Sequence, residues 1–159
     1  MRPPVLPRYN RHRMSQRFTL AEAESLIPLL DRLLREAATM KAEYDEAEKI
    51  LQDLKERVVL MGGVTINRNQ ALDARGRREV SGARLKHLLE QVQNTGCLVK
   101  DLGVGLVDFP TLYRGQEVYM CWKLGEAAIE SWHGVDEGFR GRKPIDQDFR
   151  DHHRGDPEQ

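Results

Sequence analysis

The residues best suited to chemistry gather near the C-terminal end of the sequence, between Cys121 and Asp136. This stretch contains one thiol, three carboxylates and one histidine. Glu126, Glu130 and His133 follow one another at i, i+4 and i+7, so a helix here would place them on one face. Carboxylates combined with an imidazole suit zinc, iron or manganese. The spacing therefore predicts a site for a divalent transition metal formed by Glu126, Glu130, His133 and Asp136.

Asp108 is a further candidate metal ligand, because it lies between two apolar residues in a segment with β-strand character. A buried carboxylate needs a cation or hydrogen-bond donors as partners. Lys123 or a backbone amide of a turn could supply them, and Asp108 would then have a structural role. The alternative is that Asp108 approaches the 126–136 segment and completes the metal site.

Each of these residues also has an ordinary structural interpretation. Glu126 would lie in the first turn of the expected helix and His133 in its last turn, where the helix dipole favours an acid and a base. Glu130 with His133 is a common surface pair worth a few tenths of a kcal/mol. A di-iron helical site needs two Glu-x-x-His helices, and the sequence has one such motif. Cys121, next to Trp122, suits a small core residue better than a nucleophile.

The composition favours a single domain with a wide solvated surface. Of 159 residues, 40% are hydrophobic and 31% charged, and the mean hydropathy is −0.61. No apolar run approaches the roughly 18 residues of a membrane span, and the N-terminus lacks the apolar core of a signal peptide. Two cysteines without CxxC spacing do not form a disulfide framework. We therefore expect a cytoplasmic protein without membrane contact.

The charge balance gives little support to nucleic-acid binding. Lys+Arg and Asp+Glu both number 25, so net charge provides no general attraction to phosphates. A local basic cluster could still contact them. No aromatic residues accompany that cluster, so a solvated surface is the favoured interpretation. The cluster consists of Arg75, Arg77, Arg78, Arg84 and Lys86.

The N-terminal third predicts a long helix with a kink near its start. Thr19 and Glu22 form a capping box, and Pro28 divides the helix into a segment at about 20–27 and a long segment at 28–60. Apolar residues recur at alternating steps of four and three, the period of a coiled-coil seam. This apolar seam consists of Leu26, Leu30, Leu33, Ala37, Met40, Tyr44, Ala47, Leu51, Leu54, Val58 and Met61.

A second, shorter helix should fold back on the first. The stretch from Gly62 to 78 contains few large apolar residues and is predicted to be a loop, and the second helix is predicted at 79–95. It is less than half as long as the first helix, so part of the apolar seam should lack a partner within the hairpin. We expect the C-terminal part of the chain or another molecule to cover the remainder.

After Gly96 the hydrophobic period changes to two, which predicts three antiparallel strands followed by a short helix at 126–133. A hairpin turn at Arg114-Gly115 pairs Asp108 with Cys121 and leaves Asp108 on the face away from the core. Pro110 favours a sheet edge or a strand end. The predicted fold is α+β, with a helical hairpin at 19–95 and a small three-stranded sheet and terminal helix at 96–145. Residues 1–17 would be a flexible basic arm, 18–145 a single domain and 146–159 a disordered tail.

Three motifs, "RFTLAEAE", "GCLVKDLGVGLVDFP" and "VYMCWKLGEAAIESWHGVDEGFRGRKPI", resemble a family of small bacterial proteins catalogued as domain of unknown function 2203. The resemblance spans about Phe18 to Ile145 and implies no reaction. Glu130 belongs to this sequence's version of the pattern. The shared pattern draws attention to Asp108, Cys121, Trp122, Glu126, Trp132 and His133.

Two functional hypotheses follow. The first is a non-enzymatic binding or assembly module that forms a homo-oligomer, or binds another helical protein, through the long helix. The second is a metal-binding protein or metal-dependent enzyme that uses Asp108, Glu126 and His133 with Glu130 or Asp136. The sequence leaves open whether the protein is an enzyme.

Overall fold

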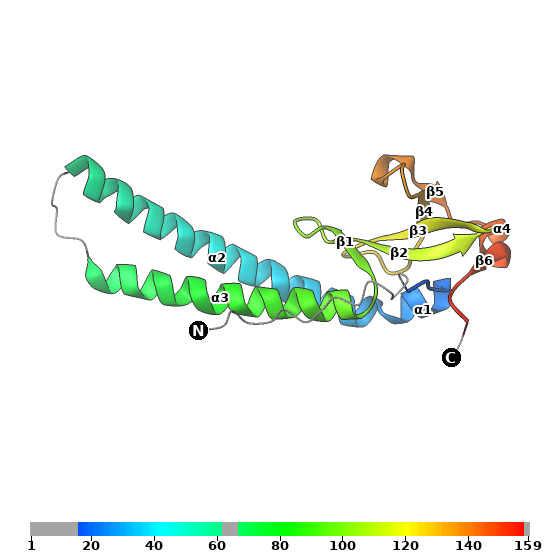
Figure 1. Cartoon of the computed structure of the whole chain (residues 1–159), viewed down its shortest axis with the longest axis horizontal. Coiled ribbons are helices and arrows are strands. Elements are labelled where there is room, and N and C mark those ends of the chain that lie inside the picture. The colour runs from blue at the N-terminus through cyan, green and yellow to red at the C-terminus, as the bar shows by residue number, and fades with distance from the viewer. Residues whose placement is uncertain (1–15, 62–66, 158–159) are drawn as a thin grey trace, which may run out of the picture.

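The computed structural model describes residues 16–61 and 67–157. Two long helices, α2 (Ile27–Met61) and α3 (Arg68–Asn94), form an antiparallel hairpin that projects as an arm from a head (Figure 1). The head contains an antiparallel sheet and the short helices α1 (Leu20–Ser25) and α4 (Gln147–His152). The predicted α+β class with a helical hairpin is therefore confirmed. In the described part of the chain, no helix combines the length and apolar content that crossing a membrane requires.

The kink at the start of the long helix is confirmed. The Thr19 hydroxyl accepts a hydrogen bond from the backbone N–H of Glu22, and the Glu22 carboxylate accepts one from the N–H of Thr19. Leu26 separates α1 from α2. Pro28 thus lies in the first turn of α2, where a backbone N–H has no partner within the helix. The proline ends one helix without weakening the next.

The loop predicted at 62–78 is wrong over its described part, because α3 begins at Arg68. Asn67 caps this helix by accepting a hydrogen bond from the N–H of Gln70. The segment lacks large apolar residues but contains good helix formers, and a buried alanine, Ala74, is enough for contact with α2. The C-cap predicted at Gly62-Gly63 lies outside the described residues.

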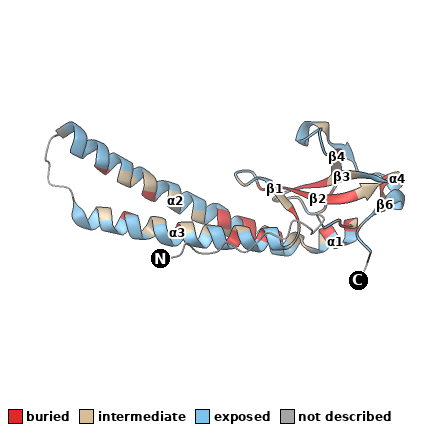
Figure 2. Ribbon diagram, in the orientation of Figure 1, coloured by how far each residue is buried: buried red, intermediate tan, exposed pale blue. Residues whose placement is uncertain are grey.

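From Leu26 to Leu54 the apolar seam of α2 is buried or partly buried by α3 and, near the head, by the sheet. The prediction that part of the seam lacks a partner within the hairpin is wrong over most of this length, because α3 is longer than expected. The alternative of cover by the C-terminal part of the chain holds near the head. Leu30 and Leu33 are buried near the head, and Ala47 and Leu54 are buried far along the arm (Figure 2). Because α3 has 27 residues, it accompanies α2 along most of its length. Val58, near the end of the arm, is the first seam residue to be exposed, at 38%.

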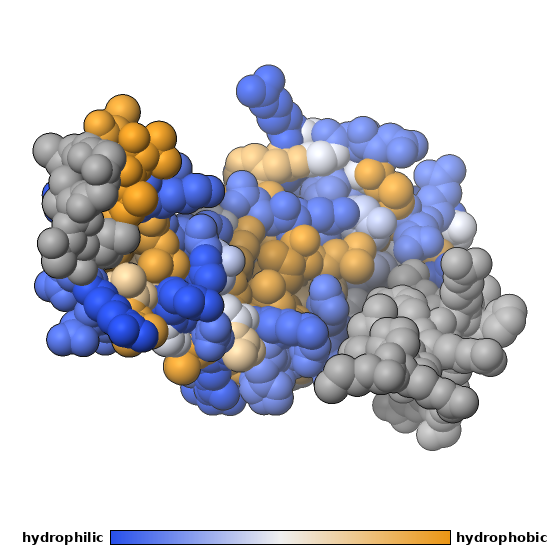
Figure 3. Space-filling view, turned by 60° about the vertical axis from the view of Figure 1, so that its left-hand side comes forward, coloured by the Kyte–Doolittle hydropathy of each residue, from blue (hydrophilic) through white to orange (hydrophobic). Residues whose placement is uncertain are grey.

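Apolar side chains are instead exposed at the end of the arm. Val59 is 74% exposed and Leu60 83%, and Figure 3 shows an apolar patch at this end. Neither residue belongs to the seam.

The sheet has six strands rather than three. The expected strands are present, and three further strands come from the C-terminal segment. The order is β1-β2-β3-β4-β5, with β6 paired to β2. The strands are β1 (Leu98–Asp101), β2 (Leu106–Tyr113), β3 (Gln116–Lys123), β4 (Ser131–Gly134), β5 (Lys143–Pro144) and β6 (His153–Arg154).

The predicted register of the central hairpin is confirmed. Asp108 pairs with Cys121, and the turn lies at Arg114-Gly115. One face of β2 and β3 packs into the core together with α1, α2 and α3. This face consists of Val107, Phe109, Val118, Met120 and Trp122.

Pro110 lies inside β2, where the sheet is locally an edge. On the side of β2 away from β3, β1 pairs only as far as Asp108 and β6 begins at Leu112. The Pro110 carbonyl lies in this gap and accepts a hydrogen bond from the backbone N–H of Phe18. The missing N–H of proline therefore interrupts no ladder hydrogen bond.

The helix predicted at 126–133 does not form. Residues 126–130 have an irregular conformation, and Ser131–Gly134 form strand β4 on β3. The eight-residue segment has helix-favouring residues, but the open edge of β3 offers backbone partners that a short helix lacks. Tertiary pairing overrides the local preference.

The segment predicted to be a disordered tail is folded over its described residues, 146–157. Asp146 caps α4 by accepting a hydrogen bond from the N–H of Phe149, whose side chain is 0% exposed. The Phe149 ring packs against Trp132 and His153. Asp156 also exchanges hydrogen bonds with Arg17, at the other end of the described chain. One well-placed aromatic residue holds a segment that is otherwise poor in apolar residues.

Candidate metal centre

Three adjacent strands present polar side chains on the sheet face that turns away from the helices. Asp108 on β2 lies between Val107 and Phe109, which enter the core, so the alternation of a strand directs the Asp108 carboxylate to the opposite face. Cys121 lies directly opposite on β3. His133, on β4, pairs with Tyr119 and belongs to the same face.

Asp108, Cys121 and His133 form a compact buried cluster. His133 Nε2 lies 3.1 Å from both Oδ1 and Oδ2 of Asp108. One potential ligand atom from each of the three residues lies within 4.8 Å of the others. The residues are only 1%, 1% and 2% exposed, respectively. In the described residues this is the one group of three or more such side chains close enough to hold a metal ion.

The hydrogen bonds of His133 require a proton or a cation between its ring and Asp108. Nδ1 lies 2.8 Å from the carbonyl oxygen of Gly134, which can only accept, so Nδ1 must carry a proton. In a neutral ring Nε2 would then be an acceptor facing a second acceptor, the carboxylate. Either an additional proton or a cation must therefore lie between Nε2 and the carboxylate oxygens.

Cys121 is a thiol in this environment rather than an activated nucleophile. Burial, followed by the negative charge of Asp108, raises its pKa to about 12. Nucleophilic cysteines need a lowered pKa, usually provided by a cation or an adjacent imidazole. In a catalytic cysteine–histidine pair, a nitrogen of the imidazole faces the sulfur. Here Nε2 of His133 faces the Asp108 carboxylate instead. The cluster is better suited to binding a cation, which would itself remove the thiol proton.

Lys100 and Tyr119 lie beside the cluster. Lys100 Nζ is 4.0 Å from Asp108 Oδ2 and 4.8 Å from the centroid of the Tyr119 ring. The Tyr119 and His133 rings meet edge to face. Burial is the largest effect that raises the pKa of Tyr119, and nearby carboxylates raise it further, so the phenol stays neutral. Lys100 therefore supplies part of the charge that Asp108 requires, from a side chain that is 42% exposed.

A family model described as an uncharacterized conserved protein, DUF2203, matches residues 16–145, which is most of the chain. The chain belongs to the DUF2203 family. The matched region includes all three residues of the cluster, whereas α4 and β6 follow it. No curated protein and no solved structure matches this DUF2203 protein.

The structure brings together two of the five predicted metal ligands of the DUF2203 protein, Asp108 and His133. Glu126 instead stabilises the turn after β3, where its Oε2 accepts a hydrogen bond from the N–H of Lys123, and its Oε1 lies 3.9 Å from Arg142. Asp136 and Glu130 are exposed and do not belong to the cluster. The helical face that linked Glu126, Glu130 and His133 does not exist, because His133 lies on a strand.

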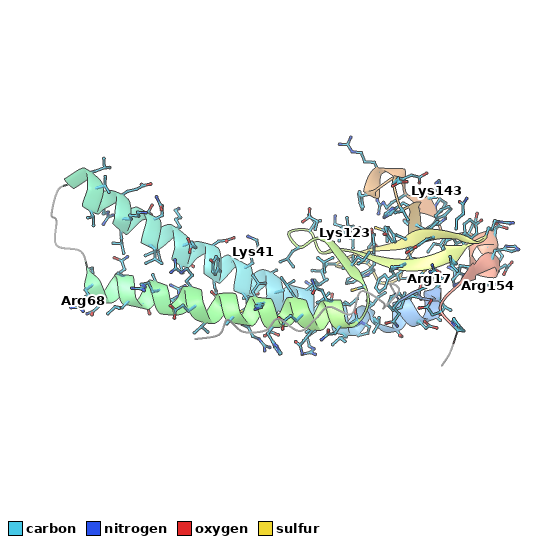
Figure 4. The ribbon with its side chains drawn as sticks, in the orientation of Figure 1. Arg17, Lys41, Arg68, Lys123, Lys143 and Arg154 are labelled. Carbon is cyan, nitrogen blue, oxygen red and sulfur yellow. The ribbon has the colours of Figure 1, made fainter. Side chains whose placement is uncertain are left out.

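Lys123, one of the two partners suggested for Asp108, is not the cation that lies beside it. Lys123 is exposed at the end of β3 (Figure 4). Lys100 Nζ instead lies 4.0 Å from Asp108 Oδ2. Cys121 was predicted to be a core residue, and its role in the cluster was missed. The predicted pairing of Asp108 with Cys121 was the available signal, since directly opposite residues share a face.

The arginine cluster of α3 mostly pairs with acids of α2. Arg78 Nη1 lies 2.8 Å from Glu48 Oε1, and the guanidinium of Arg84 binds Glu36. Arg77 contacts Glu46 in the same way at 3.5 Å. These side chains bridge the two helices of the arm. Their positive charges are paired with glutamates of α2, as expected for a solvated surface.

Proposed function

We propose that this DUF2203 protein binds a divalent transition-metal ion, with zinc the best match, through Asp108, Cys121 and His133. The supporting observation is that His133 Nε2 faces the Asp108 carboxylate while Nδ1 is already committed as a donor. A metal ion would satisfy both acceptors and, in addition, the Cys121 sulfur.

The chemistry and spacing of the cluster are appropriate for zinc. Thiolate, imidazole and carboxylate are all zinc ligands, with bond lengths of about 2.0–2.3 Å, which place neighbouring ligand atoms about 3.3–3.8 Å apart in a tetrahedron. The three candidate atoms lie within 4.8 Å of one another, so adjustments of about an ångström are sufficient. Strands β2, β3 and β4 each supply one ligand, so the ion would cross-link the centre of the sheet.

A metal-free interpretation competes with this proposal. A proton on Nε2 would turn the pair into a buried hydrogen-bonded ion pair, with Lys100 as an additional cation near Asp108. In such a pair the Cys121 thiol would keep its proton and donate a hydrogen bond to Asp108 instead of binding an ion. The role of the sulfur therefore separates the two interpretations.

Cobalt titration of tag-free protein is the decisive experiment, because a thiolate–cobalt bond gives a charge-transfer band in the near ultraviolet. We expect about one equivalent of cobalt or zinc per chain and a band that Cys121→Ser abolishes, with an affinity loss of roughly 100-fold or more. Cys97→Ser is the matched control. Cys97 is also buried, but its thiol contacts Thr95 and the Val92 carbonyl instead of the cluster.

Two results would refute the metal site. One is a folded wild-type protein, by circular dichroism, that contains no metal as purified and binds neither ion in titration. The other is a cobalt band that Cys97→Ser removes as completely as Cys121→Ser.

A further inference from the structure

A groove of about 630 Å³ lies along the side of the helical arm. Its lining residues belong to α2 and α3 and not to the strands that carry the metal cluster. Tyr44 of α2 and Gly82, Leu85 and Leu89 of α3 line its apolar part. Gly82 leaves room for the Tyr44 ring, since a Cβ atom at this position would lie 3.2 Å from two ring carbons. The ring can therefore approach α3 closely and extend the groove onto α2.

Leu85, which packs partly against the core, and Leu89 extend the apolar face of α3 beyond its buried residues. Leu88 and Val92 are fully buried against α2 and the head, whereas Leu85 and Leu89 are only partly buried. The two groove leucines are four positions apart and so lie one above the other on the helix. An apolar groove of this form, on paired helices, is suited to receiving another helix.

We propose that the occupant is α3 of a second copy of this chain, packed antiparallel across a two-fold axis. The charges at the rim of the groove support this choice. Lys86 and Glu90 are both exposed, line the groove and lie one helical turn apart. An antiparallel two-fold arrangement brings Leu85 against Leu89 of the partner subunit and Lys86 towards Glu90 of the partner subunit, twice per dimer.

A two-fold interface requires a patch that is complementary to itself, and an apolar centre with one base and one acid on its rim meets this requirement. A parallel arrangement would instead place equal charges opposite each other. The chain has 25 basic and 25 acidic residues, so two copies do not repel each other at long range. Two hairpins joined in this way form a four-helix bundle, a common solution for amphipathic helices.

Charge reversal tests the arrangement without disturbing the core. Wild-type protein should sediment as a dimer at micromolar concentration. Lys86→Glu and Glu90→Lys should each raise the dissociation constant by about tenfold or more, because each replaces two attractive contacts with repulsive ones. A mixture of the two single variants should recover the dimer as a heterodimer, since all four rim charges are then complementary. The double variant K86E/E90K should recover it as a homodimer.

Asp53→Lys and Arg57→Glu are matched controls. Both residues are exposed and one turn apart on α2, but neither lines the groove, so these reversals should leave the dissociation constant unchanged. Circular dichroism verifies that each variant is folded. A wild-type monomer up to several hundred micromolar would overturn the proposal. So would a dimer that is insensitive to Lys86→Glu, or single variants whose mixture does not associate.

Discussion

His133 Nε2 lies 3.1 Å from both carboxylate oxygens of Asp108, although the two residues are 25 positions apart and on strands separated by β3. Because Nδ1 donates to the Gly134 carbonyl, the contact depends on a proton or a cation between ring and carboxylate. Asp108 and His133 therefore act as a unit, and the behaviour of each on substitution depends on the other.

Removal of one member of this pair should be more harmful than replacing it with a hydrogen-bonding analogue. His133→Ala leaves a buried carboxylate without its main partner, which should lower the free energy of unfolding by roughly 3–5 kcal/mol. Asp108→Asn should cost less, because the asparagine amide can donate to the unprotonated Nε2 of a neutral ring. Urea denaturation in the presence of a chelator measures both. Exposed Glu130→Gln should have no effect, and a loss below 1 kcal/mol for His133→Ala would contradict the importance of the pair.

Metal affinity should increase with pH, because Cys121 must lose a proton to bind. Its pKa of about 12 means that the thiol is protonated throughout the range from about pH 6 to 8. Each proton that the metal displaces raises the affinity about tenfold per pH unit. The logarithm of the association constant should therefore rise with pH, and Cys121→Ser should reduce that slope by about one.

Calorimetry with competing chelators at several pH values measures this slope. Cys97→Ser should leave it unchanged, because that thiol does not belong to the cluster. Equal slopes for the wild type and Cys121→Ser would mean that the sulfur remains protonated or unbound.

Phe149 should be essential for the stability of the head, although it follows the region matched by the family model. Its ring is 0% exposed and packs against Trp132 and His153. Phe149→Ala should lower the free energy of unfolding by about 3–5 kcal/mol. Neighbouring Arg150 is exposed, so Arg150→Ala should change it by less than about 0.5 kcal/mol. Chemical denaturation distinguishes the two, and equal small effects would show that the segment contributes little.

Two turn glycines should differ in their tolerance of alanine. Gly105 and Gly115 both have positive φ, +70° and +79°, so alanine strains the backbone at either position. At Gly105 the new Cβ would also lie 2.4 Å from the Leu124 Cβ, whereas nothing lies within 4 Å at Gly115. Gly115→Ala should cost about 1 kcal/mol, and Gly105→Ala clearly more. Thermal unfolding of the two variants tests this, and an equal cost would contradict the close approach of Gly105 to Leu124.

Local signals in the sequence were sufficient for much of the architecture. The capping box at Thr19 and the kink near Pro28 depend on backbone chemistry within a few residues. The hairpin turn at Arg114-Gly115 set the register that places Asp108 opposite Cys121, as observed. The alternation of apolar residues correctly separated the core face of β2 and β3 from the opposite face.

The errors lie where tertiary contacts override local preference. The start of α3 was missed because Ala74 has a small side chain and gives a weak hydrophobic signal, although it is buried against α2. The 126–133 segment favours a helix in isolation, but the edge of β3 converts its last residues into β4. The role of Phe149 depends on Trp132 and His153, which lie against its ring only in the folded chain.

The candidate site shows the same division. The sequence by itself identified Asp108 as a carboxylate that needs a partner, because hydrophobic context is a local property. His133 was selected as a candidate ligand for its residue type and for a helical spacing that does not form. Only the tertiary structure decided that these two residues meet across β3 with Cys121, since strand order places them together independently of sequence distance. A buried polar group takes its hydrogen-bond partner from the residues that the fold places beside it, and here the assembled sheet determines which residues those are.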